Sequence, residues 1–205
     1  MLIDVTSPPR GLSSGRGLLA AYTATIFLSA FLLFSVQPMF AKLVLPRLGG
    51  SPGVWSVAMV FFQSMLLLGY AYAHLLTSRL SLKTASLVHI GVMLVSVLAL
   101  PLSIPEGWGT PPESGQTLWL LGLFAVGVGL PFFAVSANGP LLQAWFARSG
   151  HAHAADPYFL YGASNVGSFA SLILYIILIE PQFGLSNQTV LWSACLLYTS
   201  PSPRD

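Results

Sequence analysis

The sequence SGQTLWLLGLFAVGVGLPFFAVSANGPLLQAWFA, residues 114–147, is a run of 34 residues without Asp, Glu, Lys or Arg. About 20 apolar residues of helix are enough to cross the hydrocarbon core of a bilayer. Backbone N–H and C=O groups in lipid must be bonded within the chain, which favours a helix. The run therefore predicts a transmembrane helix, placed at Leu118 to Val135.

Four more uncharged runs, of 25, 31, 22 and 23 residues, occur along the chain. Only 7% of all residues are charged, whereas a soluble domain has about 25%. The runs predict helices at Leu18 to Phe40, Val54 to Leu76, Ala85 to Ile104 and Tyr158 to Ile179. The sequence thus predicts an all-α, polytopic membrane helical bundle with five complete transmembrane helices and a truncated sixth, which begins near Thr189.

Both ends of the chain are set apart from this bundle. The first apolar run is longer than the 7 to 15 residues typical of a signal sequence and is followed by no clear A-x-A cleavage site, so we expect it to be retained. The last residues, CLLYTSPSPRD (195–205), resemble a translated adapter from a sequencing library. The predicted parts are a cytoplasmic N-terminal tail (1–16), a transmembrane domain that is incomplete at its C-terminus (17–194) and an adapter-derived artefact (195–205). The alternative, a genuine polar C-terminus, would interrupt a helix inside the bilayer.

The basic residues predict the orientation, because Lys and Arg are enriched in cytoplasmic loops. With the N-terminus inside, the cytoplasmic segments hold five basic residues and the outer segments two; these are Arg10, Arg16, Arg79, Lys83 and Arg148, against Lys42 and Arg47. A cytoplasmic N-terminus is therefore predicted. The net charge of +2 is spread without a basic cluster, so the expected partner is the lipid bilayer and not nucleic acid. The oligomeric state is left open.

Small and polar residues inside the predicted helices are the candidate packing and binding positions. Ala163, Gly167 and Ser171 recur at every fourth residue, a pattern that lets two membrane helices approach closely. Asn165 lies beside this stripe. An amide at membrane depth needs a partner, so it either bonds a neighbouring helix, the favoured interpretation, or binds a ligand.

Gln37 and Gln63 present the same two alternatives. A cavity lined by Gln37, Gln63 and Asn165 would be neutral. No Asp or Glu lies within the five predicted helices, and this argues against an ion pump or a proton-coupled carrier.

No catalytic, cofactor-binding or metal-binding residue is predicted. His151, His153 and Asp156 share one polar loop but lack the further ligands of a tight metal site. His74 and His89 are isolated and are expected to form local hydrogen bonds. No glycine-rich loop follows a strand, so no cofactor is expected.

Three stretches taken together resemble a known family. They are FSVQPMFAKLVLPRLGGSPGVWSVAMVFFQSMLLLGYAYAH (34–74), NGPLLQAWFA (138–147) and DPYFLYGASNVGSFASLILYIILIEP (156–181). They look like the N-terminal membrane region of bacterial fused MFS/spermidine synthase proteins, in which a spermidine-synthase-like domain follows the helices. The resemblance implies an integral protein of the bacterial inner (cytoplasmic) membrane.

The resemblance also implies a function connected with polyamines. In the family, the soluble domain would transfer an aminopropyl group from decarboxylated S-adenosylmethionine to putrescine. The present chain is expected not to catalyse this, because it lacks the glycine-rich loop and the carboxylates that the reaction needs. The leading hypothesis is a membrane domain that anchors, and handles substrate for, a missing C-terminal aminopropyltransferase-like domain. The alternatives are a transporter or permease module and a structural membrane scaffold.

Overall fold

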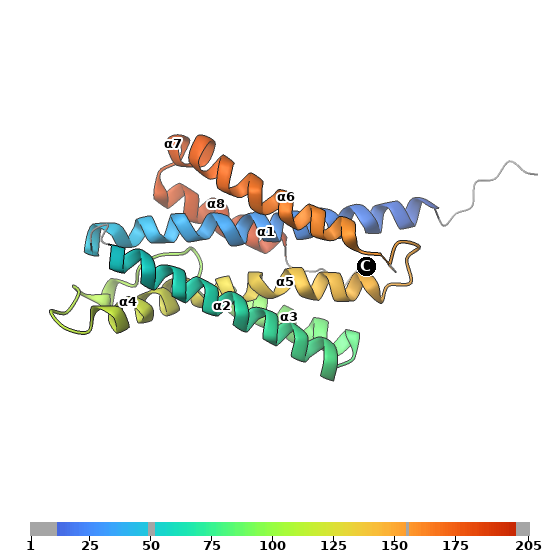
Figure 1. The fold of residues 1–205 in the computed structure, drawn as a ribbon, viewed down its shortest axis with the longest axis horizontal. Helices are drawn as coiled ribbons and strands as arrows, with labels where there is room; N and C mark the ends of the chain where they lie inside the picture. The colour runs from blue at the N-terminus through green and yellow to red at the C-terminus, as the bar shows by residue number, and fades with distance from the viewer. Residues whose placement is uncertain (1–11, 49–51, 155, 200–205) are drawn as a thin grey trace, which may run out of the picture.

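The computed structural model describes residues 12–48, 52–154 and 156–199, and the regular elements in these ranges are all helices (Figure 1). The all-α prediction is confirmed. In order, the elements are α1 (Leu12–Leu48), α2 (Pro52–Arg79), α3 (Leu82–Val97), the 3-10 turn η1 (Glu106–Trp108), α4 (Gln116–Phe124), the π turn η2 (Ala125–Gly129), α5 (Leu130–Ala147), α6 (Tyr158–Leu174), the π turn η3 (Tyr175–Ile179), α7 (Glu180–Gln182) and α8 (Leu185–Tyr198).

Four continuous helices among the described residues are long and apolar enough to cross a membrane. They are Gly15–Arg47, Pro52–Arg79, Gln116–Ala147 and Tyr158–Gln182. Each contains one of the predicted spans, which supports the interpretation as a polytopic membrane bundle. The fifth predicted span, Ala85 to Ile104, is not confirmed, because α3 is only 16 residues long and ends at Val97.

Proline chemistry explains where α3 ends. Its first turn is capped by Ser81, whose Oγ accepts from the N–H of Thr84 at 3.3 Å. After Val97 the next three N–H groups bond to carbonyls only three residues back, at 3.0–3.1 Å. Pro101 has no N–H to donate and disfavours helical geometry in Leu100. The chain therefore leaves the helix here.

The helix that contains the 114–147 run continues well beyond the predicted end at Val135. It runs through α4, η2 and α5 to Ala147. Pro131 would normally stop it, because it cannot donate to the carbonyl of Gly127 and its ring crowds that group. Gly127 is the middle residue of the π turn η2. In a π turn the backbone hydrogen bonds join residues five apart, whereas in an α-helix they join residues four apart. Pro181 stands in the same relation to Ile177, the middle residue of η3.

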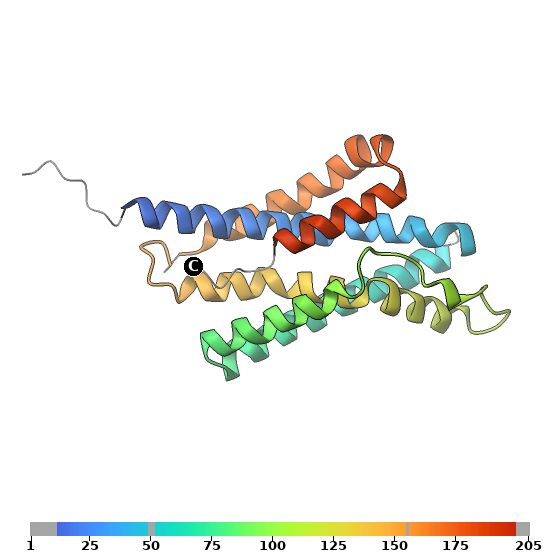
Figure 2. The ribbon, with the colours of Figure 1, turned by 180° about the vertical axis from the view of Figure 1, so that it is seen from behind.

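The helices form an elongated bundle in which α1 lies between α6 and α5 (Figures 1 and 2). The α2 helix packs on α5, α3 packs on the other side of α5, and α8 packs on α1. At the centre is a cluster of five phenylalanine rings with neighbouring centroids 4.9–5.4 Å apart, formed by Phe40, Phe61, Phe62, Phe124 and Phe132.

The basic residues fall into two groups, one at each end of the bundle. The start of α1, the α2–α3 turn and the α5–α6 loop lie together at one end, with Arg16, Arg79, Lys83 and Arg148 (Figure 1). The end of α1, with Lys42 and Arg47, lies at the other. Arg148 donates to the carbonyl of Thr77 at 2.9 Å and so caps the last turn of α2.

Candidate functional site

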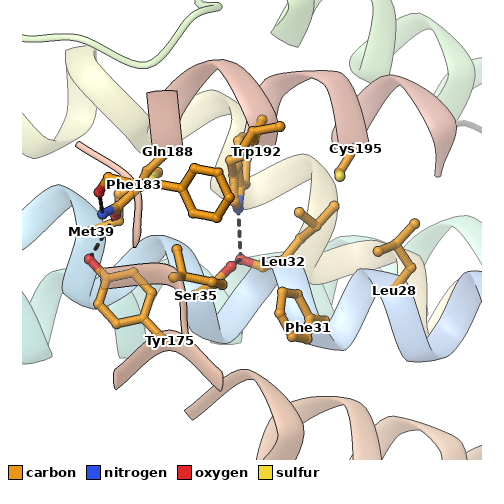
Figure 3. Close-up of a pocket in the computed structure, with 12 residues that line it drawn as sticks. Leu28, Phe31, Leu32, Ser35, Met39, Tyr175, Phe183, Gln188, Trp192 and Cys195 are labelled. Carbon is orange, nitrogen blue, oxygen red and sulfur yellow. Dashed lines mark hydrogen bonds between the residues drawn. The ribbon is translucent and has the colours of Figure 1, made fainter. Parts of the chain in front are cut away.

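A cavity of about 230 Å³ lies between α1, η3 and α8 (Figure 3). Its walls are largely aliphatic and aromatic side chains, and five side chains with polar ends also reach it. The lining residues are Leu28, Phe31, Leu32, Ser35, Met39, Tyr175, Ile179, Phe183, Gln188, Leu191, Trp192 and Cys195.

Four of these five polar ends are bonded to other protein groups, and the Ser35 hydroxyl donates to the carbonyl of Leu32 at 3.2 Å. The hydroxyl of Tyr175 donates to Oε1 of Gln188 at 3.1 Å, and Nε2 of Gln188 donates to the carbonyl of Phe183 at 2.7 Å. The indole of Trp192 donates to the carbonyl of Leu32 at 2.9 Å, as the dashed line in Figure 3 shows. The cavity therefore offers apolar contact and no spare hydrogen-bonding group from these residues, so its chemistry is that of an apolar pocket.

An ion pair lies near the cavity. Lys42 of α1 pairs with Glu180 of α7, and its Nζ is 5.7 Å from the ring centroid of Tyr175. Both charged side chains are partly exposed, so the pair is partly screened and contributes little to stability. It joins α1 to the end of the Tyr158–Gln182 helix.

Three hydrogen-bonded polar side chains are buried where α1, α3 and α5 meet. Nε2 of His89 in α3 lies 2.6 Å from Oδ1 of Asn138 in α5. Nδ2 of Asn138 donates to Oγ of Ser29 in α1 at 3.2 Å. The three side chains are 0%, 1% and 3% exposed. This His89–Asn138–Ser29 chain is an interhelical polar contact of the kind that the sequence predicts at other positions.

The three amides singled out in the sequence lie elsewhere. Gln37 is half-buried and donates to the carbonyl of Leu33 in its own helix at 3.3 Å. Gln63 on α2 and Asn165 on α6 are exposed, and neither has a hydrogen bond to another described residue. None of the three lines the 230 Å³ cavity. The structure therefore does not bring these amides together into a neutral cavity.

The stripe of small residues faces α1. Ala163 is half-buried, and Gly167 and Ser171 are buried. A Cβ added to Gly167 would overlap the carbonyl oxygen of Phe27 and lie 3.1 Å from its carbonyl carbon. The contact between α1 and α6 is thus a backbone contact, of the kind that small-xxx-small patterns allow.

The histidine loop serves a structural contact. Nε2 of His151 lies 3.0 Å from the carbonyl of Gly15, and Nδ1 of the same ring accepts from the N–H of His153 at 3.1 Å. These bonds hold the α5–α6 loop against the start of α1. No set of three His, Cys, Asp or Glu side chains within residues 12–48, 52–154 and 156–199 is arranged to hold a metal ion.

Asn138 is the site residue that the sequence analysis missed. The predicted helix ended at Val135, which put Asn138 in a loop, where an amide needs no explanation. The signal was present, since Asn138 is an amide within a run of 34 uncharged residues and a polar group at such a depth needs a partner.

The fold and these contacts define a class, a helical protein with four apolar helices of membrane length in the part of the chain that the structure describes. Compared with protein-family models, with curated proteins and with solved structures, the chain has no match.

Proposed function

We propose that the chain is the integral membrane domain of a spermidine-synthase-like fusion protein and that its work is to anchor that protein. The observation that carries the proposal is the set of four apolar, membrane-length helices packed in one bundle. The link to spermidine synthase rests on the resemblance of the stretches at 34–74, 138–147 and 156–181. Transport is less well supported, because Gln37, Gln63 and Asn165, the groups considered for a path, are separated in the bundle.

The proposed topology has six crossings of a bacterial inner membrane. The α3 helix alone is short, but the chain from α3 through residues 98–105 travels the length of the bundle (Figure 2). We take this segment as the fifth complete crossing, together with the four long helices. The α8 helix returns toward the end where α1 begins and is the incomplete sixth.

Two measurements test this proposal. Membranes from cells that make the protein are washed with alkaline carbonate, and the protein is expected to stay in the pellet. Release into the supernatant would contradict a spanning domain. The gene downstream of codon 194 is then recovered, and we expect it to encode a Rossmann-like domain with a glycine-rich loop and the acidic residues that hold a diamine. A different downstream domain would overturn the link to spermidine synthase and leave the membrane assignment intact.

The orientation gives a separate prediction. Cys195 is the only cysteine, so a Cys195→Ser background allows single cysteines to be placed at will. Ser114 and Ser81 are both exposed and lie in loops at opposite ends of the bundle. With the N-terminus in the cytoplasm, a membrane-impermeant maleimide added to intact cells should label Ser114→Cys and leave Ser81→Cys unlabelled until the cells are permeabilised.

Ser81 also caps α3, so Lys83→Cys in the same turn is the repeat measurement. Labelling of the 81 and 83 positions in intact cells, with protection at 114, would show that the bundle has the opposite orientation.

A further inference from the structure

Three buried polar atoms, one in the ring of His89 and two on neighbouring rings, have no hydrogen-bond partner among the described residues. They are Nδ1 of His89 itself, the hydroxyl of Tyr72 on α2 and Nε1 of Trp145 on α5. The ring centroids of Tyr72 and Trp145 lie 6.0 and 6.3 Å from that of His89. His89 is 0% exposed and Trp145 5%. Unpartnered buried polar atoms cost about 1–3 kcal/mol each, so three at one place call for a common explanation.

The hydrogen bonds that link Nε2 of His89 to Asn138 and Ser29 determine which groups donate and which accept. Asn138 donates through Nδ2 to Ser29, and therefore presents its oxygen to His89. An amide oxygen only accepts, so Nε2 of His89 carries the proton that it donates. Neutral His89 then has a lone pair on Nδ1. Of the other two groups, the indole N–H of Trp145 can only donate, and the hydroxyl of Tyr72 can donate or accept.

These requirements select a neutral ligand that donates and accepts at once. No Asp, Glu, Lys or Arg lies between residues 48 and 78, 84 and 105, or 114 and 147, the stretches that carry Tyr72, His89 and Trp145. A cation would meet the Trp145 N–H with no carboxylate to balance it, and an anion would meet the lone pair of His89. A water molecule has the donors and acceptors to bond all three groups, and buried waters typically make about three hydrogen bonds to otherwise unsatisfied atoms.

We propose that Tyr72, His89 and Trp145 form a buried site for one water molecule. The water donates to Nδ1 of His89, accepts from Nε1 of Trp145 and makes its third bond with the hydroxyl of Tyr72. It ties α2, α3 and α5 together, while Asn138 and Ser29 extend the same chain of bonds to α1. The site is independent of the proposed link to spermidine synthase and stands if that link fails.

Nuclear magnetic resonance on the full chain in lipid nanodiscs tests the site directly. The protein is labelled with ¹⁵N at histidine and tryptophan, and magnetisation transfer from water to the side chains is measured. The chain has four His and five Trp, and His89→Gln and Trp145→Phe assign the two signals. Trp192 is the matched control, because it is buried to the same degree but its indole donates to Leu32.

The expected result is transfer from water to the Trp145 indole and to His89, with none to the Trp192 indole, and a His89 ring protonated at Nε2. In Trp145→Phe, transfer to His89 should weaken while the ring stays protonated at Nε2. Three results would each overturn the site. They are no transfer to Trp145 and His89, protonation of His89 at Nδ1, and unchanged transfer to His89 in Trp145→Phe.

Discussion

Replacing Gly167 by leucine is expected to force α6 away from α1 and to lower the thermal stability of the bundle in detergent. Even a Cβ at this position would overlap the carbonyl oxygen of Phe27, and the atoms it meets belong to the α1 backbone. A flexible side chain can turn aside, but a helix backbone cannot move without disturbing its neighbours. We expect a loss at or above the upper end of the range of about 1–3 kcal/mol that overpacking usually costs.

The matched control is Gly162→Leu, the same change five residues earlier in α6. Gly162 is exposed and a Cβ there meets nothing within 4 Å. Leucine favours helix over glycine by up to about 1 kcal/mol, so this variant should be as stable as the parent or slightly more so. Equal melting temperatures for the two variants, measured side by side, would show that the α1–α6 contact does not hold in the membrane protein.

Replacing Asn138 by leucine should give the second largest loss of stability. The change removes the acceptor for His89 Nε2 and the donor to Ser29 Oγ, and leaves both groups buried. The cost of an unsatisfied buried group is about 1–3 kcal/mol, whereas hydrogen bonds between membrane helices contribute on average only about 0.6 kcal/mol. We expect the free energy of unfolding to fall by about 2 kcal/mol, because the change removes hydrogen bonds and also leaves their former partners buried and unsatisfied.

Gln63→Leu is the control for that experiment, since it makes the same kind of change at an exposed amide. Gln63 bonds no other described residue, so its replacement should leave the unfolding transition within about 0.5 kcal/mol of the parent. A destabilisation by Gln63→Leu that equals or exceeds that of Asn138→Leu would mean that Gln63 forms the more important interhelical bond and that α2 has a partner on its outer face.

The fold could be predicted from the sequence mainly because charge is so scarce. A break in a membrane span needs a polar loop, and the charged residues mark those loops, so all four membrane-length helices contain a predicted span. The residues at which the helices end were less predictable. Proline is expected to kink or stop a helix, but Pro101 follows the end of α3 whereas the helix continues past Pro131 after a π turn. The proline itself does not encode which of these two outcomes occurs.

The candidate site was harder to predict for a different reason. The pattern of Ala163, Gly167 and Ser171 indicates a close helix contact because the spacing alone defines the face. The pairing of His89 with Asn138 depends on how α3 and α5 are placed against each other, since the residues are 49 positions apart. A single sequence shows that each is polar and deep, but not that they meet.

The length of α1 has a consequence for the depth of the charged groups. From Arg16 to Lys42 the chain advances 26 residues, or about 39 Å at 1.5 Å per residue. A bilayer with its headgroup layers is about 40–45 Å thick. With Arg16 in one headgroup layer, Lys42 and its partner Glu180 therefore lie in the other, among phosphates and water. In that position Lys42 would be within reach of a lipid phosphate that competes with Glu180, and a charge at each surface would fix the depth of α1.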